Sequence, residues 1–114
     1  MIWTAWNDGL HHTSGGGYGF SVKEADRDLD FVRSWKVVTI ELPVSSGYLT
    51  ATANTDKDSF WNGCPRLINK QIGIWLLKMH FARWLKGQPP RFEVLPIGDG
   101  HFRVVGCLDS DCAS

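Results

Sequence analysis

The sequence predicts an α+β fold, in which an antiparallel sheet built from hairpins carries one principal α-helix packed on a face. The chain has 114 residues, 43% hydrophobic and 21% charged, which suits a single domain over residues 1–114 with one core. Two pairs of strand-like segments are each joined by turn residues. The segment between these pairs repeats apolar residues at a helical period.

The first third of the chain predicts two strands and a short helix. Residues 2–6 form a first strand, which ends at the Asn-Asp-Gly turn of residues 7–9. Residues 18–23 alternate aromatic and small side chains, as a half-buried strand does. Residues 24–31 then form a short acidic helical turn.

Two hairpins follow from β-branched segments and turn residues. Residues 35–42 and 48–54 are rich in β-branched residues, and the five residues 43–47 between them predict a hairpin connection. Residues 91–97 and 101–105 flank a Gly-Asp-Gly turn and predict a second hairpin.

The principal helix lies between the hairpins. Pro65 suits a first helical turn, and Gly87 followed by two prolines ends the segment, so we expect a helix from about Pro65 to His80 or Leu85. On a helical wheel it has two apolar stripes. The first contains Ile68, Ile72, Trp75, Met79 and Ala82, and the second contains Leu67, Ile74, Phe81 and Leu85.

A sheet covers only one of these stripes. Either long side chains and the terminal hairpin cover the second stripe, or a partner covers it. We expect a homodimer, with Leu67, Ile74 and Phe81 in the interface.

The charge is balanced overall but uneven along the chain. Twelve basic and twelve acidic residues give no net charge, so no global field attracts nucleic acid or a membrane. From Arg66 to Arg91 there are six basic residues and no acid, with aromatic residues among them. A solvated helix face is the favoured interpretation, and single-strand nucleic-acid binding stays possible.

Cysteine use and the absence of apolar runs indicate a cytoplasmic protein without a membrane span. No apolar run reaches the roughly 18 residues that span a bilayer, and the first residues lack the pattern of a signal peptide. The sequence has three cysteines and no CxxC pair, which favours reduced thiols over a disulfide framework or a zinc site. These cysteines are Cys64, Cys107 and Cys112. Pairing of Cys107 with Cys112 is the alternative.

The stretch WNDGLHHTSGGGYGF, residues 6–20, raises the question of a site. It lacks the spacing of a phosphate-binding loop, and a strand-like run follows it where such a loop needs a helix. His11 and His12 are neighbours that point to opposite sides of an extended chain, so we expect no metal site and no cofactor. Two interpretations remain: a flexible glycine loop, or a loop that carries a general acid and base.

A second polar cluster, residues 54–62, leads into the helix. It is either helix-start chemistry or a groove wall opposite the glycine loop. If the two loops meet at one end of the sheet, they form a pocket with His11 or His12 at its mouth. Its walls would be Trp3, Trp6, Tyr18 and Trp61.

Several motifs resemble those of a family of small uncharacterised bacterial proteins. They are WTAWN, HH before GxGYG, DRD, NTDKDSFW, CPxL, IGxWL and WxKGxPPxF, and they cover nearly the whole chain. Small proteins of this kind are frequent among mobile integron gene cassettes. The resemblance implies an adaptive accessory role and no named activity.

Three functions are therefore considered, and whether the protein is an enzyme stays open. The preferred one is a module that binds a small organic ligand or a protein partner in an aromatic cleft. The second is a hydrolase of RNA or phosphodiesters, with His11 or His12 as acid and base and Lys57, Arg27 or the basic segment binding phosphate. The third is an interaction protein that docks through the second helix stripe.

Overall fold

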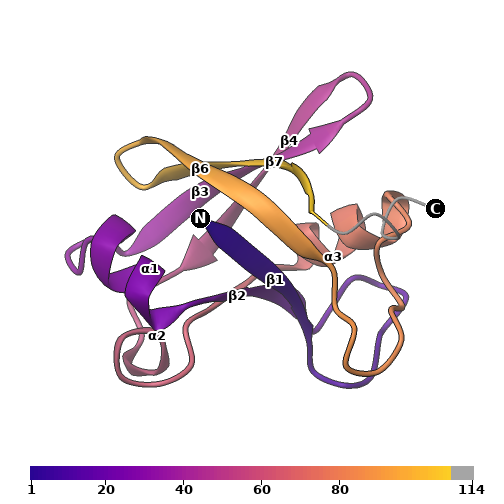
Figure 1. The fold of residues 1–114 in the computed structure, drawn as a ribbon, viewed down its shortest axis with the longest axis horizontal. Coiled ribbons are helices and arrows are strands. Elements are labelled where there is room, and N and C mark those ends of the chain that lie inside the picture. The colour runs from indigo at the N-terminus through magenta and orange to yellow at the C-terminus, as the bar shows by residue number, and fades with distance from the viewer. Residues whose placement is uncertain (109–114) are drawn as a thin grey trace.

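The computed structural model describes residues 1–108, which contain seven strands and three short helices (Figure 1). The strands are β1 (Ile2–Asn7), β2 (Tyr18–Val22), β3 (Val37–Val44), β4 (Gly47–Asn54), β5 (Arg66–Ile68), β6 (Arg91–Gly98) and β7 (His101–Cys107). The helices are α1 (Glu24–Asp30), α2 (Asp58–Asn62) and α3 (Lys70–Lys78). The alternative pairing of Cys107 with Cys112 falls outside this part of the chain, because Cys112 is not among the described residues.

The described strands form one sheet in the order β4-β3-β7-β6-β1-β2-β5. All neighbours in it are antiparallel except β3 and β7, which are parallel. The predicted hairpins β3–β4 and β6–β7 are confirmed, and so is the short helix α1. The edge strands β4 and β5 also contact each other, so the sheet curls and encloses its inner face.

The β3–β4 turn is shorter than the predicted five-residue connection. The ladder continues to the pair Val44 and Gly47, which leaves a two-residue turn. Pro43 lies inside the ladder opposite Tyr48. A proline is tolerated there because β3 pairs with β7 only from Thr39 to Glu41, so its other side has no neighbour at Pro43.

The predicted helix from Pro65 to His80 or Leu85 is confirmed only over Lys70–Lys78, and its predicted bounds are wrong. Residues 66–68 are β5, which pairs with β2, and α3 starts only after Asn69, whose side-chain oxygen accepts a hydrogen bond from the Gln71 backbone N–H at 2.7 Å. The helix ends at Lys78, and two residues later His80 has a φ of 62°. The principal helix is therefore nine residues long and contacts β2 and β4.

Aromatic side chains fill the enclosed face of the sheet. Phe102 lies at the centre of this core, with ring centroids 5.4 Å from Trp3 and 4.7 Å from Phe31. Trp75 reaches the core from α3 and packs on Phe92 at 5.3 Å. The predicted inward positions Ile72 and Trp75 of α3 are thus buried. Within the described residues, no helix is long and apolar enough to cross a membrane.

Candidate functional site

Asn7 and Asp8, at the start of the loop of residues 8–17, fix this loop through hydrogen bonds to its backbone. The Asn7 Oδ1 accepts hydrogen bonds from the backbone N–H groups of Gly9 and His11, at 2.8 and 3.0 Å. The Asp8 Oδ1 accepts one from Leu10 at 3.0 Å, and the Asp8 N–H donates to the Gly17 carbonyl at 2.9 Å. Short side-chain bonds to the backbone are a stabilising feature of such turns. They give the histidine loop one defined path.

The same loop packs directly on α3 through two glycines. Gly15 has a φ of 89°, and a Cβ at this residue would lie 2.9 Å from the backbone nitrogen of Ile74. A Cβ at Gly73 would overlap the carbonyl oxygen of Gly15. Only residues without a Cβ allow this approach of loop to helix. The glycine run is therefore a packing surface that holds the loop against α3.

His11 is the residue that this arrangement positions. Its φ is 49°, in the left-handed region that side chains rarely adopt. Its Nδ1 lies 2.9 Å from the Tyr18 hydroxyl, and its ring meets the edges of Tyr18 and Trp84 at centroid distances of 5.6 and 5.0 Å. Strained backbone that the surroundings hold in place is found at binding sites.

A pocket of about 700 Å³ opens beside His11. We call it the His11 pocket. It lies between the 8–17 loop and the segment before β6, and its lining is Ala5, Trp6, Asn7, Gly9, His11, Trp84, Lys86, Gly87 and Pro89. Exposed leucines adjoin it in both segments, Leu10 at 69% exposure and Leu85 at 73%. Its volume is within the range of small-molecule sites.

The pocket is basic in a chain of zero net charge. Among residues 1–108, its lining includes Lys86 and His11 and contains no Asp or Glu. Burial raises the pKa of the Tyr18 phenol, while the Arg83 charge lowers this pKa and the Asp8 charge raises it. His12 is exposed, and its Nε2 lies 3.9 Å from the Asp8 carboxylate. The pocket therefore favours neutral or anionic ligands over cations.

The predicted pocket residues divide into separate groups. Trp6 and His11 line the His11 pocket, and Tyr18 reaches it through the hydrogen bond to His11. Trp3 is wholly buried in the core and cannot line a pocket. Trp61 lies in α2, and α1 and α2 lie at the other end of the sheet from the histidine loop (Figure 1). The two loops therefore lie apart, and the pocket that was conditional on their meeting does not form.

Trp61 and Arg27 lie away from the His11 pocket, and their hydrogen bonds stabilise the packing of α1 and α2. The Trp61 indole N–H donates to the Thr55 carbonyl at 2.9 Å. Arg27 is 8% exposed, and its Nη1 donates to the Phe60 carbonyl at 3.0 Å. Its Nε also donates to Asp28 at 3.0 Å. The Arg27 guanidinium thus joins α1 to α2, which is a structural role.

The predicted interface stripe does not exist as a stripe of one helix. Leu67 lies in β5 and is wholly buried, and Phe81 lies beyond the end of α3. Ile74, the only one of the three in the helix, is half-buried against the Gly15 loop. The three residues have a helical spacing in the sequence but belong to a strand, a helix and a loop, so they share no helix face.

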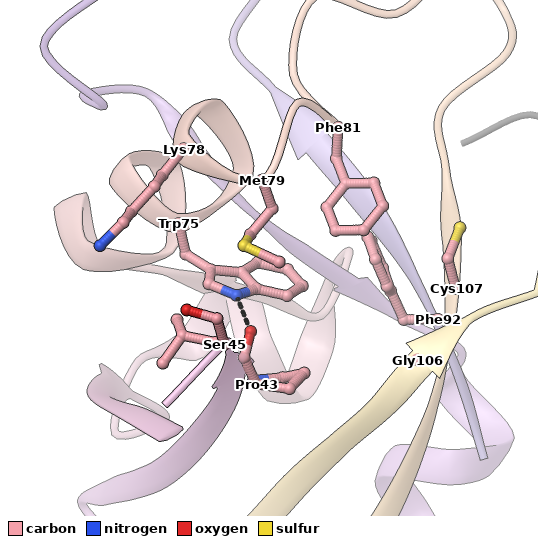
Figure 2. A pocket seen from close by; sticks show the side chains of 10 residues that line it. Pro43, Ser45, Trp75, Lys78, Met79, Phe81, Phe92, Gly106 and Cys107 are labelled. Carbon is pink, nitrogen blue, oxygen red and sulfur yellow. Dashed lines mark hydrogen bonds between the residues drawn. The ribbon is translucent and has the colours of Figure 1, made fainter. Parts of the chain in front are cut away.

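Phe81 instead lines a second pocket of about 320 Å³, between α3, the β3–β4 turn and the β6–β7 hairpin (Figure 2). Figure 2 shows Trp75 on its floor, with the indole N–H donating to the Pro43 carbonyl at 2.7 Å. The sulfur of Met79 and the ring of Phe81 form a largely apolar wall. This pocket adjoins the core and carries one charged lining residue, Lys78.

Two residues of the His11 pocket were not predicted, Trp84 and Lys86. The sequence predicts both at the end of a helix or on its basic face, and the structure places them in an irregular segment after α3. A signal was present: Trp84 lies among basic residues just before Gly87 and two prolines, where a helix cannot continue. Such a segment indicates a loop, and loops carry binding residues.

No group of three or more His, Cys, Asp or Glu side chains within residues 1–108 could hold a metal ion. Comparison with protein-family models, with curated proteins and with solved structures found no match for this chain. The geometry of the pocket is therefore the basis for the function proposed below.

Tyr18→Phe tests the hydrogen bond that holds His11. Loss of the hydroxyl should lower the free energy of unfolding by about 1 kcal/mol at neutral pH. Because the folded pKa of Tyr18 is raised, this residue stabilises the fold below its ordinary pKa near 10, and the stabilisation is lost as pH rises towards the folded value. Urea unfolding between pH 8 and 11 should show a decline in wild type that Tyr18→Phe lacks.

The matched control is Tyr48→Phe, on the exposed β4 strand. It should keep both the neutral stability and the alkaline decline. If Tyr18→Phe retains the same decline as Tyr48→Phe, then Tyr18 is not the group responsible for the decline. Unchanged stability of Tyr18→Phe at neutral pH would mean that its hydrogen bond to His11 contributes nothing measurable.

Proposed function

We propose that the protein is a ligand-binding module and that the His11 pocket is its site. The observation that carries the proposal is the pocket of about 700 Å³ walled by Trp6 and Trp84, with His11 held at its side by Tyr18. Two indole rings offer flat apolar surfaces, and Lys86 with the imidazole offers polar contacts. A planar organic molecule, neutral or anionic, fits this lining.

Pre-organisation supports binding at this place. Asn7 bonds to the loop backbone and Gly15 packs on α3, so the loop has its shape before any ligand arrives. A preformed pocket avoids part of the entropy cost of ordering a loop on binding. The exposed leucines beside the pocket, Leu10 and Leu85, add apolar surface for a larger ligand or for a protein partner.

A hydrolase is the alternative proposal, and fewer observations support it. The His11 Nδ1 faces the Tyr18 phenol, and among the described residues the pocket lining has no carboxylate to act beside the imidazole. Lys57, the expected phosphate-binding partner of the histidines, is not among the lining residues. Binding therefore requires fewer assumptions than hydrolysis.

We retain four predictions from the sequence as proposals beside this function: an α+β class, a cytoplasmic location, a homodimer and an accessory role. The α+β assignment is supported by α3 lying against β2 and β4. The homodimer loses its predicted interface, since Leu67 is buried within the chain. The two leucines beside the pocket are the exposed apolar residues that best suit a replacement interface.

The test is a thermal-shift screen of small aromatic acids, nucleosides and other metabolites, followed by affinity measurements on variants. A compound that binds the His11 pocket should lose at least about tenfold in affinity in Trp84→Ala, because stacking on an aromatic ring contributes about 1–3 kcal/mol. Trp61→Phe, at the far end of the sheet, should bind as wild type does. Equal affinity in Trp84→Ala and wild type would remove the His11 pocket as the site.

A further inference from the structure

The second pocket lies where strands β3 and β7 separate. These strands pair only where Thr39 to Glu41 lie beside His101 to Arg103. Farther along β3, Pro43 has no N–H to donate, and its carbonyl oxygen accepts the hydrogen bond from the Trp75 indole at 2.7 Å. The side chain of a helix thus takes the place of a neighbouring strand there, beside a space of about 320 Å³ (Figure 2). We call this space the Trp75 pocket.

Three aromatic rings form one end of the Trp75 pocket. The ring centroids of Trp75, Phe81 and Phe92 lie 5.1 to 5.3 Å from one another. Trp75 and Phe92 are buried, and Phe81 is half-buried. Met79 lies beside them, and its flexible thioether can adapt to the shape of an apolar ligand (Figure 2). Because the Trp75 N–H already has its acceptor in Pro43, these side chains offer a ligand apolar contacts and no hydrogen bond.

The charged and hydroxyl side chains of the lining lie at the other end. Figure 2 shows Lys78 and Ser45 on one side of the Trp75 ring, and Phe81 and Phe92 on the other. Lys78 and Ser45 are both exposed. Within residues 1–108, the lining contains no Asp or Glu, and no acidic side chain forms an ion pair with Lys78. The pocket therefore combines an apolar interior with one positive charge at its rim.

We propose that the Trp75 pocket binds an amphiphilic carboxylate, whose apolar body lies against the three rings and whose carboxylate lies at Lys78. Charge complementarity selects an anionic head group, because Lys78 is the one charged residue of the described lining. A single lysine matches the single charge of a carboxylate better than the double charge of a phosphate monoester. Burial of the apolar body supplies most of the affinity, since an exposed ion pair contributes little.

This site is independent of the function proposed above. The described linings of the Trp75 pocket and the His11 pocket have no residue in common. Each pocket also has its own indole: Trp75 lines one, and Trp6 and Trp84 line the other. The indole N–H signals in an NMR spectrum can therefore report which of the two pockets a ligand occupies.

The experiment is an NMR titration of the full chain with octanoate, phenylbutyrate, octanol and octylamine. Octanoate should bind more tightly than octylamine, which has the same chain length and the opposite charge at neutral pH. Binding should shift the Trp75 indole signal and leave those of Trp6 and Trp84 unchanged. Tighter binding of octanoate than of phenylbutyrate would identify an alkyl body, and the reverse would identify an aryl body. Either result supports the site.

Variants separate the two ends of the pocket. Lys78→Gln should lower the octanoate affinity about two- to fivefold and leave the octanol affinity unchanged, as expected for an exposed ion pair. Lys78→Glu should reverse the preference, so that octylamine binds more tightly than octanoate. Phe81→Ala should weaken octanoate and octanol alike by about fivefold or more, because both lose the same apolar contact. Met79→Ala tests the same wall should Phe81→Ala fail to fold.

Lys70→Gln is the matched control, because Lys70 is an exposed lysine at the start of α3 and outside the pocket lining. It should bind octanoate as wild type does. Absence of octanoate and phenylbutyrate binding in folded wild type would overturn the proposal, and so would equal octanoate affinity in wild type and Lys78→Glu. Shifts at Trp6 and Trp84 in place of Trp75 would contradict it and place the ligand in the His11 pocket. Concentration-dependent shifts at Phe81 without ligand would identify a second copy of the chain as the occupant and also overturn it.

Discussion

Phe102→Ala is expected to lower the free energy of unfolding by about 3–5 kcal/mol. Phe102 is wholly buried, and its ring lies within 6.3 Å, centroid to centroid, of Trp3, Phe31 and Trp35. These three rings come from β1 and from the segment after α1, and they would face a cavity that rigid aromatic neighbours cannot fill. A loss of this size is a large part of the roughly 5–15 kcal/mol that stabilises a domain.

Urea unfolding monitored by circular dichroism gives the value directly. The control is Val105→Ala on the same strand, where the side chain is 48% exposed and the change should stay within about 0.5 kcal/mol. A decrease below about 1 kcal/mol for Phe102→Ala would mean that the aromatic core repacks around the missing ring, and the central role assigned to Phe102 would be wrong.

Gly73→Ala is the second substitution with a large expected effect. Two opposing contributions determine whether it raises or lowers the free energy of unfolding. Alanine favours a helix interior over glycine by about 1 kcal/mol. However, its Cβ would overlap the Gly15 carbonyl oxygen and lie 2.7 Å from the Gly15 carbonyl carbon, and these are backbone atoms that no side-chain rotation can move away. Overpacking of this kind costs about 1–3 kcal/mol or more. We expect net destabilisation of about 2 kcal/mol and displaced His11 ring resonances.

Gly106→Ala provides the control, because an added Cβ there meets nothing within 4 Å. It should change the free energy of unfolding by less than about 0.5 kcal/mol. If Gly73→Ala were as stable as wild type, with unchanged His11 resonances, the histidine loop would not be seated on α3. The loop would then need another explanation for its defined path.

The sequence predicts correctly those elements whose structure depends on residues close together in the chain. The β6–β7 hairpin follows from a turn and two strands adjacent in the chain. By contrast, β5 has three residues, too few for a strand period, and it exists because it pairs with β2, about forty-five residues earlier. A single apolar residue, Leu67, points inward from it. In the sequence this residue fits equally well on a helical wheel.

The same distinction applies to the site. His11 and Trp6 were predicted as site residues from the composition of one loop and the strand before it, and both line the pocket. Trp84 joins them from more than seventy residues away, which no local pattern indicates. Trp3 was predicted to be beside Trp6, although an odd number of steps along a strand places two side chains on opposite faces. This parity puts Trp3 in the core and Trp6 at the surface.

The position of the β6–β7 hairpin in the sheet also constrains how the chain folds. β6 pairs with β1, and β7 pairs with β3, so among the described strands this hairpin alone joins the β3–β4 pair to the β1–β2–β5 group by strand pairing. During synthesis, β1 to β5 leave the ribosome as two separate strand groups that expose the apolar face meant for the core. Most of the cooperative stability therefore arises only when the last strands arrive, and folding should be slow for a chain of this length.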